Sequence, residues 1–82
     1  MRTALSRSIR AELLEGDGVT AELAAWLELP NHTVRNGMWY LRKIGHVKQA
    51  GGAFRNKWLP SIYALTARGR TVARMERKEV AR

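Results

Sequence analysis

The chain has 82 residues, a formal net charge of +8 and no cysteine, and 45% of its residues are hydrophobic while 27% are charged. This length allows one modest core, and the composition excludes a disordered tail, a disulfide-bonded scaffold and a cysteine-based zinc site. No apolar run approaches the roughly 20 residues that span a bilayer, and the first residues lack the apolar run of a secretory signal, so we expect a cytoplasmic protein without a membrane partner.

The first predicted helix spans residues 3–15. An apolar residue recurs at every fourth position, at Leu5, Ile9 and Leu13, which indicates one stripe that faces the core. The segment Gly16, Asp17 and Gly18 ends the pattern.

A very short strand at Val19 and a second helix over residues 20–28 are expected next. Thr20 is the expected N-cap, and Pro30 biases Leu29 away from helical dihedrals, which ends the helix. The expected buried face consists of Leu23, Ala24 and Leu27.

The third predicted helix spans residues 31–44, with Asn31 as its N-cap and Gly45 as the left-handed residue that ends it. Its apolar stripe has spacings of four, three and three residues, at Val34, Met38, Leu41 and Ile44. At about 100° per residue, the opposite face carries polar, basic and aromatic side chains. These are His32, Asn36, Trp39 and Lys43, flanked by Thr33, Arg35, Tyr40 and Arg42.

The pattern then changes to a β-hairpin over residues 46–65, with strands at 47–50 and 62–65 and a long basic tip. Thr66 is expected to cap a last helix over residues 67–80. The predicted fold is mainly α with a small β-hairpin, an α+β domain over residues 1–82 in the order helix, helix, helix, hairpin, helix. The packing positions expected on the last helix are Val72, Ala73 and Met75.

Charge is unevenly distributed along the chain. Residues 1–28 carry five acids and three arginines, whereas residues 29–75 contain no acid. Solubility explains a total charge but not such a separation, which indicates a polyanionic partner. The bases of the acid-free segment are Arg35, Arg42, Lys43, Lys48, Arg55, Lys57, Arg68, Arg70 and Arg74.

Three groups of residues are each common alone, but their order and spacing together indicate a known family. They are Thr20-Ala-Glu-Leu-Ala24, then Thr33-Val-Arg35 with Leu41 and Gly45-His-Val47, and finally Tyr63-Ala-Leu-Thr66 with Gly69-Arg70. Between about Val19 and Arg70 the sequence therefore resembles the winged helix-turn-helix family, of the MarR, ArsR or PadR kind of bacterial or phage regulator. The resemblance implies sequence-specific binding of double-stranded DNA by a transcriptional regulator, with the third helix as the recognition helix and a homodimer as an option.

Two features depart from the family pattern. Glu28 or Leu29 fills a turn that often contains glycine, at a cost of about 1 kcal/mol if a left-handed conformation is required. Gly37 lies inside the third helix, and we favour close packing against the second helix over close approach to a phosphate as its reason.

DNA contacts are expected on the third helix and at the hairpin tip. Arg35 can donate two hydrogen bonds to guanine, and Asn36 can pair with adenine. Trp39 is given a supporting role, partly buried against the wing. The predicted set is Asn31, His32, Thr33, Arg35, Asn36, Trp39, Arg42, Lys43, Arg55 and Lys57.

The residue inventory argues against an enzyme, a metal site and a cofactor. The chain has only His32 and His46, which are 14 positions apart and lack acidic neighbours. Three alternatives to a regulator stay open: a protein-interaction module on the same scaffold that grips a host enzyme such as RNA polymerase, an excisionase-like architectural DNA-binding protein, and RNA binding. The last helix is expected to present a solvated basic face, or to join Leu5 and Ile9 of another copy.

Overall fold

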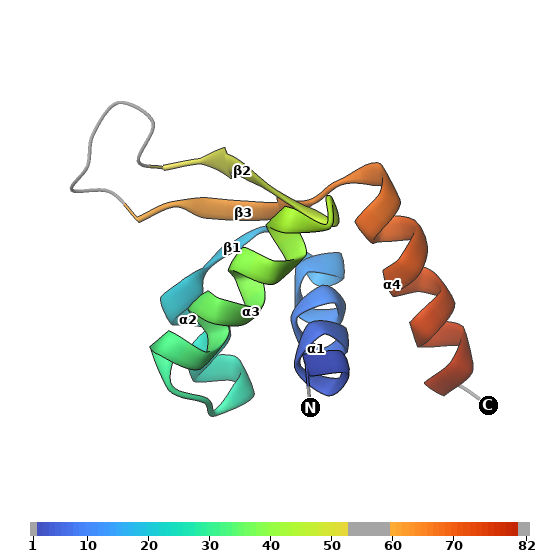
Figure 1. The fold of residues 1–82 in the computed structure, drawn as a ribbon, viewed down its shortest axis with the longest axis horizontal. Coiled ribbons are helices and arrows are strands. Elements are labelled where there is room, and N and C mark those ends of the chain that lie inside the picture. The colour runs from blue at the N-terminus through green and yellow to red at the C-terminus, as the bar shows by residue number, and fades with distance from the viewer. Residues whose placement is uncertain (1, 53–59, 81–82) are drawn as a thin grey trace.

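The computed structural model describes residues 2–52 and 60–80, which form four helices and three strands. Figure 1 shows α1 between the α2–α3 pair and α4, with the sheet across one end of the helices. The predicted order of helices and hairpin strands is confirmed, and so is the short strand at Val19. In chain order the elements are α1 (Arg2–Glu15), β1 (Gly18–Val19), α2 (Thr20–Leu27), α3 (Asn31–Lys43), β2 (Val47–Gly51), β3 (Ile62–Leu65) and α4 (Ala67–Val80).

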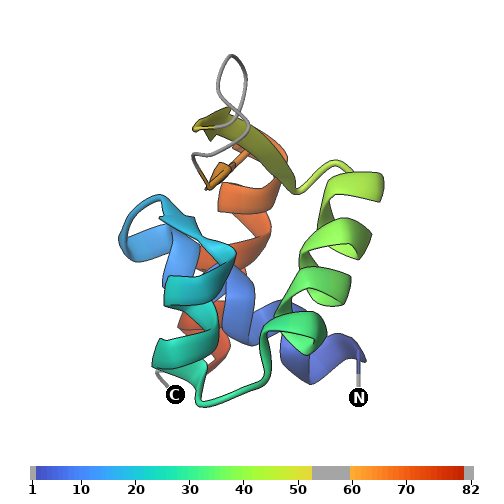
Figure 2. The same ribbon diagram turned by 90° about the vertical axis from the view of Figure 1, so that its left-hand side faces the viewer.

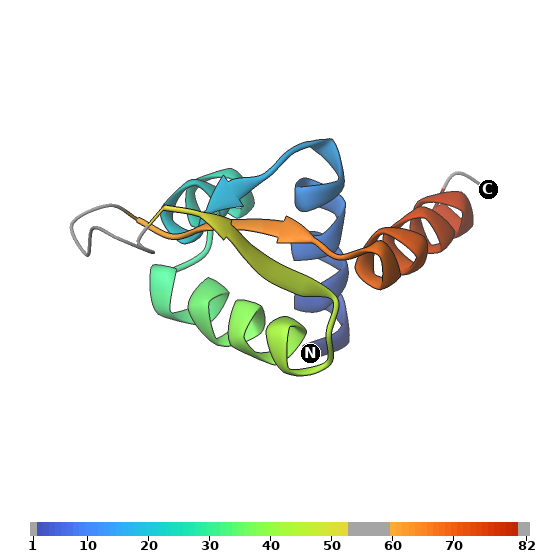
Figure 3. The same cartoon turned by 90° about the horizontal axis from the view of Figure 1, so that it is seen from above.

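The sheet is antiparallel, with the order β1-β3-β2, so that β3 is its central strand. Figure 3 shows β2 and β3 side by side across the helices, on the side of the molecule away from the end of α4. β2 pairs with β3 from Val47 opposite Leu65 to Gly51 opposite Ile62, and the register shifts between Gln49 and Gly51. β1 adds the pairs of Gly18 with Tyr63 and Val19 with Ile62. Since a two-stranded hairpin alone is marginally stable in water, this third strand fixes the base of the hairpin.

The core lies where the helices meet the sheet. Its fully buried side chains come from α1, α2, α3 and β3, so every layer contributes to one cluster. Figure 2 shows α2 and α3 below the sheet, joined by the turn at the end farthest from it. The largest fully buried side chains are Ile9, Leu23, Leu41, Leu65 and Val34.

The turn between α2 and α3 contains a left-handed residue other than glycine, at the first of the two positions that the sequence analysis named. Glu28 has φ 57° and ψ 44°, and its N–H donates to the carbonyl groups of Ala24 and Ala25. The N–H of Leu29 also donates to the carbonyl of Ala24, at 3.0 Å. These bonds satisfy the last carbonyls of α2 and reverse the chain direction within a few residues.

The predicted N-caps at Thr20 and Asn31 are wrong. The cap positions are Val19 and Pro30, both extended and both without a side-chain cap hydrogen bond. Val19 takes its extended dihedrals from strand β1, where it pairs with Ile62. Pro30 has φ −61° and its carbonyl accepts the N–H of Thr33 at 3.1 Å. Strand pairing and the proline ring therefore start these helices, in place of polar caps.

Gly37 is buried on α3, and its neighbour is α1, whereas the sequence analysis named the second helix. A Cβ atom at this position would lie 2.8 Å from Cδ1 of Ile9 and 2.9 Å from Cδ2 of Leu5. The packing explanation is thus supported with a corrected partner. The absence of a side chain at Gly37 allows α1 and α3 to approach closely.

Ala73 is 3% exposed on α4 and Val72 is partly buried, as expected, whereas the packing prediction for Met75 is wrong. Met75 is 60% exposed, and Glu76 turns toward α1 in its place. The option that Ile9 joins a second copy is also wrong, because Ile9 is 0% exposed within its own chain.

Thr66 joins the end of α3, the end of β3 and the start of α4. Its N–H donates to the carbonyl of His46 at 3.0 Å, and its hydroxyl donates to the carbonyl of Gly45 at 2.6 Å. The same hydroxyl accepts the N–H of Gly69 at 3.1 Å, which confirms Thr66 as the cap of α4. A Cβ atom on Gly69 would overlap the carbonyl group of His46. We call this contact of Gly45, His46, Thr66 and Gly69 the Thr66 joint.

We predict that Gly69→Ala lowers the free energy of unfolding by about 2 kcal/mol, because the added methyl group meets a backbone carbonyl that cannot rotate away. Helix propensity alone favours alanine over glycine by about 0.5–1 kcal/mol. A net loss of stability would therefore come from the contact of the added methyl group with the carbonyl. Urea unfolding followed by circular dichroism measures the change. Gly16→Ala is the matched control, since nothing lies within 4 Å of its added Cβ. Equal stability of wild type and Gly69→Ala would contradict the described joint.

Candidate nucleic-acid interface

The rotation of α3 about its axis is set by its apolar stripe. Val34 and Leu41 are 0% exposed and Met38 is 2% exposed, while Ile44 is partly buried against the same cluster. The stripe is therefore where the sequence placed it, and the other side of α3 faces outward. Most of the predicted contact residues on α3 are exposed, and Thr33 is half-buried. The exposed ones are Asn31, His32, Arg35, Asn36, Trp39, Arg42 and Lys43.

Trp39 differs from the prediction. Its side chain is 63% exposed, whereas we expected it to be partly buried against the hairpin. The sheet contacts Arg42 instead, whose guanidinium carbon lies 5.7 Å from the centroid of the Tyr63 ring on β3. The ammonium group of Lys43 lies 5.1 Å from the centroid of the Trp39 ring. These two cation–π contacts orient the basic side chains at the end of α3.

A hollow of about 290 Å³ lies between α1 and the outer side of α3. Asn36 and Trp39 line it from α3, and Leu5 and Ser6 line it from α1. The sequence analysis missed this contribution of α1, because it assigned Leu5 to the core stripe or to contact with another copy. Trp39 also lines a second, shallower hollow with Arg42 and Lys43, so its ring separates the two.

The elements differ in charge: α3 and β2 carry bases and no acid, whereas α1 and α4 carry both. The acids near the N-terminus lie on α1, on the following loop and on α2, and three of them surround Trp26 in a further hollow: Glu12, Glu15 and Asp17. Exposed bases lie on α3, on β2 and on α4, which is on the far side of α1 from α3 (Figure 1). Arg55 and Lys57, the predicted contacts of the hairpin tip, lie outside the described residues.

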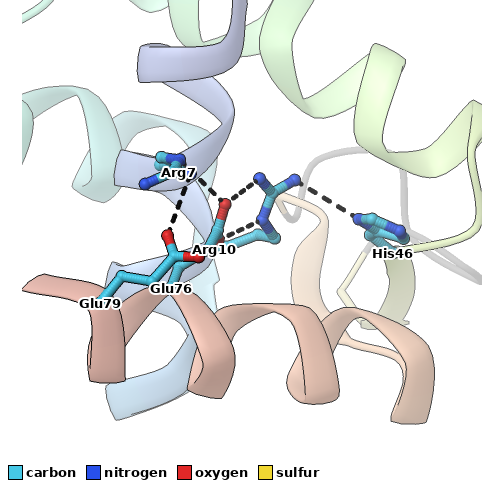
Figure 4. Close-up of polar contacts among 5 residues, drawn as sticks. All are labelled: Arg7, Arg10, His46, Glu76 and Glu79. Carbon is cyan, nitrogen blue, oxygen red and sulfur yellow. Dashed lines mark hydrogen bonds and ion pairs between the residues drawn. The ribbon is translucent and has the colours of Figure 1, made fainter.

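A network of polar contacts connects α1, α4 and His46, which lies between α3 and β2 (Figure 4). The buried Arg10 donates to both carboxylate oxygens of Glu76, with distances of 2.8 Å and 2.6 Å. Nη1 of Arg10 lies 3.4 Å from Nδ1 of His46. Arg7 adds ion pairs to Glu76 and Glu79, each at 3.3 Å. The network thus holds α4 against α1 beside the end of α3.

The sequence analysis also missed this network. Its one sequence signal is that Ser6, Arg10 and Leu13 recur at spacings of four and three, which makes a second buried row beside the apolar stripe of α1. The hydrogen bonds from Arg10 lower the pKa of Glu76, against the effect of burial. Burial lowers the pKa of His46, and the charges of Arg10 and Arg68 add to this effect while Glu76 opposes it.

The arrangement of α2, a tight turn, the outward-facing α3 and a β-hairpin permits comparison with solved structures. A ZitR variant of Lactococcus lactis in apo form has a TM-score of 0.86 at 19% identity, covering 98% of this chain and 59% of its own. The chain has a winged-helix fold. The adhesin competence repressor AdcR of Streptococcus pyogenes gives a TM-score of 0.83 at 14% identity, over 94% of this chain and 56% of its own. A transcriptional regulator from Clostridium thermocellum gives a TM-score of 0.78 at 19% identity, covering 98% of this chain and 82% of its own.

This winged-helix chain spans less than two thirds of the length of the ZitR and AdcR chains. No family model and no curated protein matches its sequence. None of the helices in residues 2–52 and 60–80 combines the length and hydrophobicity that a bilayer-spanning segment requires. In the same part of the chain, no group of three or more histidine, cysteine, aspartate or glutamate side chains could hold a metal ion.

We predict that Glu76→Gln lowers the free energy of unfolding by about 3 kcal/mol, because it leaves the charge of Arg10 buried without its partner. Urea unfolding at neutral pH measures this loss. Glu15→Gln is the matched control, since the Glu15–Arg77 pair is exposed and such pairs contribute about 1 kcal/mol or less. Similar losses in the two variants would show that the network does not stabilise the contact of α1 with α4.

We also predict that stability falls on acidification in two ranges. The folded protein holds the pKa of His46 below its usual 6.5, so the unfolded chain binds this proton more readily and stability is lost from pH 6.5 down to the folded pKa. The lowered pKa of Glu76 stabilises the fold above its usual 4.5, and this contribution disappears as the pH falls through the folded pKa. Urea unfolding measured across both pH ranges should show that His46→Gln flattens the pH dependence of stability in the upper range only. An unchanged upper range in that variant would contradict this assignment.

Proposed function

We propose that this chain binds double-stranded DNA in a sequence-specific manner and acts as a transcriptional regulator, with α3 as the recognition helix. The observation that carries the proposal is the outer side of α3, which exposes amide, guanidinium and ammonium groups and belongs to a segment without acids. Polyanion binding needs the cations, and base readout needs the amides and guanidinium groups. The regulator from C. thermocellum and the repressor from S. pyogenes support the same class of function.

The proposed roles follow from position along α3. The N-terminal half of a recognition helix enters the major groove deepest, so Asn31, His32, Arg35 and Asn36 are assigned to base edges. Thr33 is assigned to a phosphate or a thymine methyl group. Arg42 and Lys43 lie in the last turn of α3 and are assigned to phosphates. Arg55 and Lys57 are proposed to contact phosphates or a narrow minor groove from the wing tip.

A homodimer would place two copies of α3 about 34 Å apart, which is one turn of DNA. Because Ile9 is buried within its own chain, such a dimer would have to use other residues, and Met75 is the large exposed apolar side chain of α4. Binding to a host enzyme and architectural bending of DNA are the competing functions that the following experiment separates.

Selection from a pool of random duplexes, followed by titration of the selected duplex at several salt concentrations, tests the proposal. A regulator retains one preferred sequence above a background that weakens steeply as salt rises. DNA bending without sequence preference would assign the architectural function. No binding to any duplex at about 50 mM salt would overturn the proposal and favour a protein partner.

We predict that Arg35→Ala relaxes the preference at one base pair and costs about 1–3 kcal/mol of discrimination there. Arg55→Ala is expected to weaken binding to all sequences alike and to reduce the slope of log K against log salt by about one. Both variants are measured on the selected duplex and on its single-base-pair changes. The reverse pattern would show that α3 is not the reading surface.

A further inference from the structure

Trp39 is a large apolar side chain in the middle of an otherwise polar and basic surface. It lies about 40° around α3 from Arg35 and about 60° from Asn36, so it is between them on the outer side. Its side chain is 63% exposed. A single exposed apolar residue needs no explanation by itself, but this one lies at the centre of the surface proposed to meet DNA.

The Trp39 ring has a cation near it and a hollow beside it. The ammonium group of Lys43 lies 5.1 Å from its centroid, and the hollow toward α1 lies on its Asn36 side. Gly37 contributes no side chain to that hollow, so the space beside the ring stays open. The ring therefore offers an accessible apolar surface to a ligand.

The base edges of the major groove present hydrogen-bonding groups and one kind of apolar group, the C5-methyl group of thymine. We propose that Trp39 is a specificity-determining residue that contacts this methyl group, so that the protein distinguishes thymine from uracil at one site. The inference rests on the proposed function and deepens it, because it assigns one base of the preferred sequence to an apolar contact. The cations of α3 supply the attraction that brings the ring into the groove.

Helix geometry also predicts how far the thymine lies from the base pair that Arg35 contacts. Trp39 follows Arg35 by four residues, which is about 6 Å along the axis of α3. Successive bases on one strand are about 3.4 Å apart. The thymine contacted by Trp39 therefore lies one to two base pairs from the base pair whose preference Arg35→Ala relaxes.

The test uses the selected duplex and versions in which each thymine is replaced by deoxyuridine, one at a time. Wild-type protein should bind about fourfold more weakly to the version changed at the predicted position, which corresponds to ~0.8 kcal/mol for one buried methyl-sized group. Trp39→Ala should bind the thymine and deoxyuridine versions equally. Trp26→Ala is the matched control, because this 53% exposed tryptophan lies on α2 beside the acids, and it should keep the fourfold difference.

Three results would overturn the inference. They are a selected sequence without thymine within two base pairs of the Arg35 position, equal binding of both versions by wild type, and a fourfold difference that persists in Trp39→Ala. In each case a sequence preference that Arg35→Ala relaxes would leave the proposed function standing. Absence of duplex binding would overturn both, so the two failures are distinguishable.

Discussion

The burial of three side chains on α3 is the constraint on which the rest of this structure depends. Val34, Met38 and Leu41 fill the core from one side of the helix, and this alone determines which residues face outward. No hydrogen bond from Arg35 or Asn36 is needed to orient the outer side, since helical geometry does so. Gly37 adds the close approach of α1, which supports α3 from the flank. The polar side chains of α3 therefore face outward because Val34, Met38 and Leu41 take the core side of the helix.

The Thr66 joint and the Arg10 network act at the other end of α3. One residue, Thr66, bonds to both Gly45 and His46, while Arg10 connects His46 to Glu76 on α4. The end of α3 and the orientation of α4 are thus parts of one bonded unit. A change in the position of α4 would be transmitted to the end of α3 through backbone hydrogen bonds as well as side chains.

The sequence predicted the elements well because their signals are local. The stripes of α1 and α3, the turn at Glu28 and the cap at Thr66 depend on residues within a few positions of one another. The predictions that were wrong, and the contacts that were missed, depend on residues far apart in the sequence or on tertiary packing. Thr20 and Asn31 have the right residue types for N-caps, but strand pairing of Val19 and the ring of Pro30 decide those helix starts. Arg10 and Glu76 are 66 positions apart, so no spacing rule could reveal their pairing or the exposure of Met75 that accompanies it. The exposure of Trp39 likewise depends on where the sheet lies.

The left-handed Glu28 has a mechanical consequence. A residue with a Cβ atom prefers the right-handed region by about 1 kcal/mol, so an isolated peptide of this sequence would not keep the bend between α2 and α3. In the folded protein the bend is held by the backbone bonds of Glu28 and Leu29 to α2 and by the burial of Leu23 and Val34 in one core. Loosening that core would release the bend, and α3 would then lose its fixed orientation relative to α2.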